Sequence, residues 1–148
     1  MRVIAAAALM LVLGGGAQAR EVKAGPLTIS GLQLRATAAG VPTGAAYLTI
    51  ANSGKAADRL LSIDCACAAA AMMHKTEARG GISSMSMVDA VTVPAGGRVA
   101  FSPGGLHVML VGVKGALKAG KTQIMTLRFE KAGSVKVAFD VVDAISVR

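Results

Sequence analysis

The chain has 148 residues, with 16 Lys or Arg against eight Asp or Glu, which gives a net charge of +8. It contains one Tyr, three Phe and no Trp, so its core must be aliphatic and few rings are available to stack bases. The basic residues are scattered singly, which argues against a nucleic-acid partner. The charge fits solubility, or attraction to an acidic protein partner. A chain of this length forms one domain.

The first 19 residues are typical of a secretory signal peptide. A basic start at Arg2 precedes an apolar run from Val3 to Leu13, and an A-x-A exit ends at Ala19. The apolar run is too short to span a bilayer, and no later run is long enough. We therefore expect cleavage after Ala19, a mature domain over residues 20–148, and export to the periplasm without stable membrane insertion. The residue directly after the cut is Arg20 and not a cysteine, so a lipid anchor is not expected.

Alternation of apolar and polar residues dominates the mature chain and predicts short strands. Clusters of Gly and Pro at residues 94–97 and 102–105, and a Lys-Ala-Gly-Ser run at 131–134, predict the turns between them. Only residues 66–75 also fit a short helix. The pattern predicts an all-β, antiparallel sandwich or barrel. The expected strands cover residues 46–51, 91–93, 98–101, 106–111, 127–129 and 135–141.

The two cysteines, Cys65 and Cys67, are separated by one residue. On an extended strand their Cα atoms would lie about 6.6 Å apart. That distance is at the upper edge of disulfide reach, so a bond between them requires a turn. One bond of this kind does not make a disulfide scaffold.

Few residues are suited to catalysis. The chain has two histidines, His74 and His107, and no nucleophile-elbow, zinc-protease or phosphate-loop motif. Its acidic residues include no closely spaced pair for acid–base chemistry. The sequence therefore predicts a protein that is not an enzyme.

Methionine is concentrated near both histidines. His107 and Met109 lie two residues apart in an alternating segment, so they share one face of the expected strand. Neutral imidazole and thioether sulfur together form a soft site that favours Cu(I). The same methionines also fit simple packing, because Met109 has the strand parity of Val111 and Val113, and methionine fills gaps in cores. The methionines between positions 72 and 109 are Met72, Met73, Met85, Met87 and Met109.

The spacing of the two histidines and two methionines is more specific than their composition. Ten residues separate His74 from Met85, 21 separate Met85 from His107, and one separates His107 from Met109. This pattern, His-x10-Met-x21-His-x-Met, resembles that of the periplasmic copper chaperone family PCuA(C). The resemblance covers most of the mature chain and includes residues 46–54, 93–97, 103–110, 120–121 and 127–133.

The resemblance implies a cupredoxin-like (Ig-like) β-sandwich that binds one Cu(I) per chain. It implies His74, Met85, His107 and Met109 as the metal ligands. It also implies delivery of copper for assembly of the CuA centre of cytochrome c oxidase, with the oxidase's copper-acceptor subunit or a Sco-type protein as partner. A storage or resistance protein with the same site is the main alternative.

Two features depart from the family pattern. The sequence ends at Ser146-Val147-Arg148, without the Met- and His-rich tail that some members use for Cu(II), so no second site of that kind is predicted. Cys65 and Cys67 are not part of the pattern and are open to three interpretations: inert residues, a redox-sensitive pair, or accessory ligands near His74. A blue-copper protein is disfavoured because no cysteine lies in the C-terminal region, and a purely structural sandwich leaves the spacing unexplained.

Overall fold

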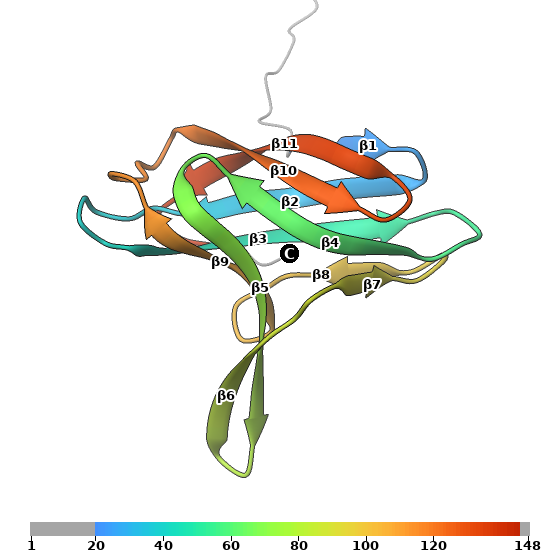
Figure 1. Ribbon diagram of the computed structural model, residues 1–148, viewed down its shortest axis with the longest axis horizontal. Coiled ribbons are helices and arrows are strands. Elements are labelled where there is room, and N and C mark those ends of the chain that lie inside the picture. Colours follow the sequence, from blue (N-terminus) through green and yellow to red (C-terminus); the bar gives the residue numbers. More distant parts are fainter. Residues whose placement is uncertain (1–19, 146–148) are drawn as a thin grey trace, which may run out of the picture.

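A computed structural model describes residues 20–145 of the chain, so the expected signal peptide lies outside the described residues. Every regular element of this part is a β-strand (Figure 1), which confirms the all-β prediction. No helix in residues 20–145 is long and apolar enough to cross a membrane. The strands are β1 (Val22–Ala24), β2 (Leu27–Arg35), β3 (Thr43–Asn52), β4 (Asp58–Cys65), β5 (Ala68–Arg79), β6 (Ile82–Met87), β7 (Val91–Val93), β8 (Arg98–Ala100), β9 (Leu106–Val113), β10 (Thr122–Phe129) and β11 (Gly133–Val142).

The strands form one continuous ladder in the order β6-β5-β9-β3-β2-β11-β10-β4-β7, with β1 added to β2 and β8 to β3. The ladder folds over on itself, so that β4 contacts β5 and β7 contacts β3. The result is a two-layered sandwich (Figure 1). The β2–β11 pair is parallel, whereas the other strand pairs within residues 20–145 are antiparallel. The expected antiparallel sandwich is therefore correct apart from this pair.

The core is mostly aliphatic, as the scarcity of rings predicts, and all three Phe residues are buried in it. Alternate residues of β3 and β11 point inward, among them Leu48 and Ile50 on β3 and Phe139 on β11, all nearly or fully buried. On β2 the buried residues are Leu27 and Ile29 before Gly31, and Leu32 and Leu34 after it, so the alternation is displaced by one residue. Gly31 has a positive φ, and the pairing with β3 shifts at the same place. The bulge lets both halves of a long strand bury apolar residues.

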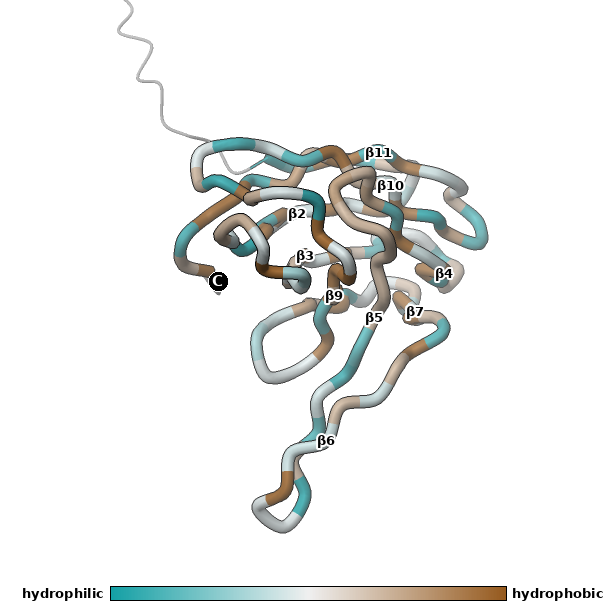
Figure 2. The backbone as a smooth tube through the Cα atoms, turned by 60° about the vertical axis from the view of Figure 1, so that its left-hand side comes forward, coloured by the Kyte–Doolittle hydropathy of each residue, from teal (hydrophilic) through white to brown (hydrophobic). Residues whose placement is uncertain are grey.

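One hairpin projects from the sandwich, although residues 68–75 of its first strand stay paired with β9. Strands β5 and β6 run together and project beyond the rest of the fold (Figures 1 and 2). Their two-residue connection is Gly80-Gly81, both with the positive φ that a type I′ turn requires. Residues 66–75 belong to a turn and to β5, so the competing helix prediction is wrong. Pairing with β9 over residues 68–75 holds this segment extended, and β6 pairs with β5 only from His74 onward.

Candidate metal centre

Strands β6, β5 and β9 carry the four predicted ligands on one face. His74 on β5 pairs directly with His107 on β9, and Met85 on β6 pairs with Thr76, two residues beyond His74. Directly paired residues of antiparallel strands project to the same side, as do residues two apart. The opposite side of β5 and β9 faces the core, where Met73 and its partner Val108 are buried. The ligand face is therefore the outer face of the sandwich.

The two imidazole rings are close enough to share a metal ion. The ring centres of His74 and His107 lie 5.8 Å apart, with an angle of 76° between the planes. A metal–imidazole bond of about 2 Å puts the ion about 3 Å from a ring centre, so two rings on one ion have centres within about 6 Å. The observed separation meets this condition.

His107 is held in position by the backbone. Its side chain is 8% exposed, and Nδ1 lies 3.0 Å from the carbonyl oxygen of Gly105. Because a carbonyl oxygen only accepts hydrogen bonds, Nδ1 is the donor and Nε2 keeps its lone pair. A metal ligand oriented through its second ring nitrogen is the usual arrangement for histidine. The turn at residues 102–105 thus fixes which nitrogen of His107 is available.

Met85 comes from the projecting hairpin and is 56% exposed. Its sulfur lies 3.1 Å from Nδ1 of His74, so thioether and imidazole already meet. Met109 is half-buried on β9, one step along the same face from His107. Three of the four side chains thus sit on strands of the sandwich or at the base of the hairpin, and Met85 reaches them from outside.

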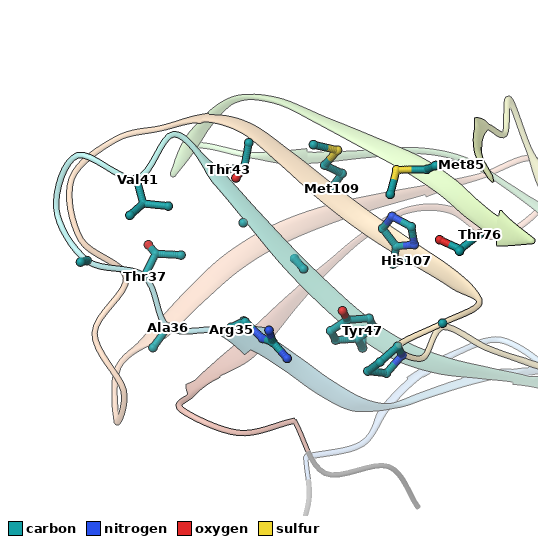
Figure 3. Close-up of a pocket in the computed structure, with 15 residues that line it drawn as sticks. Arg35, Ala36, Thr37, Val41, Thr43, Tyr47, Thr76, Met85, His107 and Met109 are labelled. Atoms are coloured by element: carbon teal, nitrogen blue, oxygen red, sulfur yellow. The ribbon is translucent and has the colours of Figure 1, made fainter. Parts of the chain in front are cut away.

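A groove of about 680 Å³ begins at this cluster. Figure 3 shows Met85, His107 and Met109 gathered at one end of it, with Tyr47 and Arg35 farther along. The groove crosses the outer side of β9, β3 and β2, and Arg35 is the only charged side chain among its lining residues. Sequence reasoning missed this groove, because its walls come from strands far apart in the chain.

The structure decides against the packing interpretations of the methionines. Met109 is not a core residue, because its neighbours Val108 and Leu110 are the buried ones. Met85 and Met87 do not fill core gaps either, since they are 56% and 64% exposed. Within residues 20–145, no group of three or more His, Cys, Asp or Glu side chains could hold a metal. Any metal held at this face would therefore depend on thioether sulfur.

Cys65 and Cys67 form a disulfide across the turn between β4 and β5, with their Cα atoms 5.1 Å apart. The turn that such a bond requires is therefore present. Cys67 precedes His74 by seven residues along an extended strand, a separation of about 23 Å. The interpretation of these cysteines as accessory ligands near His74 is wrong, because they are both distant and bonded to each other.

Comparison with known proteins gives consistent results. Residues 27–141 match the family described as LpqE-like, putative lipoprotein LpqE-like. The putative lipoprotein Lxx21020 of Leifsonia xyli subsp. xyli (strain CTCB07) is 28% identical over 151 residues, which is 97% of this chain and 90% of the relative.

Two solved structures share the fold and are 30% and 31% identical to this chain in sequence. The copper-bound PCuAC domain from PmoF2 is 30% identical, with a TM-score of 0.73, over 84% of this chain and 99% of that domain. The Cu(I) form of DR1885 from Deinococcus radiodurans is 31% identical, with a TM-score of 0.65, over 90% of this chain and 87% of that one. These matches confirm the predicted cupredoxin-like sandwich and the predicted relationship to the PCuA(C) family. The chain belongs to the LpqE-like family, which is the family of the PCuAC domains.

Proposed function

We propose that this protein is an exported copper chaperone that binds one Cu(I) through His74, Met85, His107 and Met109. The observation that carries the proposal is the meeting of two imidazoles, 5.8 Å apart, with a thioether sulfur 3.1 Å from one of them. Met109 stands on the same face, next to His107 along β9.

The chemistry of this ligand set suits Cu(I) rather than zinc or a blue-copper centre. Thioethers are soft ligands that favour Cu(I), whereas zinc sites are built from thiolate, imidazole and carboxylate. A blue-copper centre needs a thiolate beside its two histidines. Here Cys65 and Cys67 are joined in a disulfide at the β4–β5 turn, so neither supplies one.

The arrangement of these ligands also suits transfer of Cu(I) to an acceptor protein. Met85 is more than half exposed and belongs to a hairpin that packs little against the sandwich, so it is the ligand that an acceptor meets first. The groove beside the cluster offers an adjoining surface for a segment of that acceptor. Exchange would begin with replacement of the Met85 thioether by an acceptor ligand, with the ion still held by the ligands on β5 and β9.

Delivery to the CuA centre of cytochrome c oxidase is the finer part of the proposal. The recipient would be the oxidase's copper-acceptor subunit or a Sco-type protein, met in the periplasm after removal of residues 1–19. The net positive charge favours an acceptor with an acidic surface. The task is non-catalytic, since the ion is bound and released unchanged.

The first experiment is an anaerobic titration of residues 20–148 with Cu(I) in competition with a chromogenic Cu(I) chelator. The wild-type protein should retain one Cu(I) per chain, and His107→Ala and Met109→Ala should each weaken it. Met125→Leu is a matched control, because Met125 is fully buried in the core and far from the ligand face in sequence and sheet order. A wild-type protein that takes no copper from the chelator would rule out the chaperone proposal.

A deletion strain separates delivery from storage. Loss of oxidase activity that added copper restores is the result expected of a delivery protein. Sensitivity to copper with normal oxidase activity would instead identify a storage or resistance protein with the same site.

A further inference from the structure

The proposed ligands His74, Met85, His107 and Met109 are called the four-ligand site below. We propose that Met72 and Met87 form a second, weaker Cu(I)-binding position beside it. The two residues are called the thioether pair below. The proposal rests on the proposed function, because it concerns the same ion on the same face of the fold.

The strand register places the thioether pair around His74. Met87 on β6 pairs directly with His74, and Met72 precedes His74 by two residues on β5. Met72 in turn pairs directly with Met109 on β9. By the rules of strand pairing all of these residues project to the outer face. His74 is therefore surrounded by four methionines, two of which the four-ligand site leaves unused.

Met72 and Met87 are close enough to act together. They are diagonal neighbours on adjacent strands, a relation that keeps long side chains within reach of each other. Both line a small cavity of about 180 Å³ where β6 ends and the chain leaves the hairpin. This cavity differs from the groove that contains Met85, His107 and Met109. The thioether pair therefore borders a space separate from the groove, at the edge of β5 that lies toward β4.

Packing does not account for Met87. Its side chain is 64% exposed, which is more than that of Met85. A flexible apolar side chain that is this exposed buries little surface. The hydrophobic effect therefore contributes little stability at this position. The opposite face of β5 carries the charged side chains Lys75 and Glu77, paired at 3.0 Å. The hairpin is thus divided into a charged side and a side of His, Met and Thr.

Two thioethers supply fewer ligands than the four-ligand site, so the pair should fill second and empty first. Cu(I) would move between the positions by ligand exchange around His74, without a change in oxidation state. The exposure of Met87 makes the thioether pair an entry or exit position for the ion, and the buried His107 belongs to the holding position.

The test uses the purified protein labelled with ¹³C at the methionine methyl groups and titrated anaerobically with Cu(I) in NMR experiments. The first equivalent should shift the methyl signals of Met85 and Met109. The second equivalent should shift those of Met72 and Met87. In the Met72→Leu/Met87→Leu variant the second step should disappear, and the affinity for the first equivalent should change by less than about tenfold.

Met125→Leu is the matched control, because Met125 is fully buried on β10 and lines neither the cavity nor the groove. It should leave both binding steps in place. Shifts confined to Met85 and Met109 throughout the wild-type titration would overturn the proposal, as would a second step that survives the double substitution. If the Met85 and Met109 signals do not respond to the first equivalent, it is the proposed function that fails.

Discussion

The turn of the β5–β6 hairpin offers a way to weaken copper binding from a distance. Gly80 and Gly81 have φ values of 58° and 79°, and an added Cβ would meet nothing within 4 Å at either position. Replacing both by Ala therefore creates no clash and acts only through the backbone. A left-handed conformation costs a residue with a Cβ about 1–2 kcal/mol, so the double substitution strains the turn by about 2–4 kcal/mol.

This strain should fall on the hairpin rather than on the whole fold. All six residues of β6 are exposed, and an isolated two-stranded hairpin is marginally stable at best. If Met85 reaches His74 only when the hairpin is closed, apparent affinity falls with the closed fraction. A cost of about 2–4 kcal/mol then weakens Cu(I) binding by about 30-fold to about 700-fold. The midpoint of thermal unfolding should hardly change, because the core strands are untouched.

The assay is anaerobic Cu(I) competition on Gly80→Ala/Gly81→Ala, beside a thermal melt of the copper-free protein. Gly133→Ala is the matched control, since Gly133 has a φ of 75° and open space around its Cβ position but lies in the β10–β11 turn. It should lower the melting temperature and leave copper affinity unchanged. Unchanged affinity in the hairpin variant would refute the reasoning, and so would a loss of affinity as large in the control.

Three further predictions concern the scaffold. Asp58→Ala removes a buried carboxylate that accepts three backbone N–H bonds, so it should lower the free energy of unfolding by about 2–4 kcal/mol in urea melts without changing copper affinity. Phe139→Ala empties a fully buried position and should cost about 3–5 kcal/mol by the same measurement; a much smaller loss would mean that the core collapses around the gap. Cys65→Ser/Cys67→Ser should lower stability by about 1–2 kcal/mol and leave copper stoichiometry intact; lost copper would return these residues to the site.

Some of the strands that bury a regular face were predicted from the sequence, but β2 and β4, which also bury apolar residues, are absent from the expected set. Residues 106–111 and 135–141 alternate clearly, and both segments lie within strands, β9 and β11. The β5–β6 hairpin was missed because β6 buries nothing and its alternation is limited to the four residues 84–87. Its one local indication was Gly80-Gly81, a dipeptide suited to a two-residue turn. Burial patterns reveal only the strands that contribute to a core.

The sequence predicts which site residues share a face of one strand, but not which residues on different strands lie side by side. The shared face of His107 and Met109 follows from strand parity, and the structure agrees. The meeting of His74 with His107 depends on the register between β5 and β9, which alternation within each strand does not determine. The family resemblance supplied that link, and the role of the four residues as ligands stays a prediction.

The ligand face supplies no negative charge to balance the charge of a bound Cu(I). Its two imidazoles and its thioethers are all neutral when they bind, and the groove beside them contributes only the positive Arg35. A bound Cu(I) would therefore keep its full positive charge on a protein that is already strongly basic. An acceptor that offers thiolates provides the compensating negative charge that this face lacks. Transfer to such an acceptor would be favoured electrostatically, and its rate should fall as salt screens the attraction.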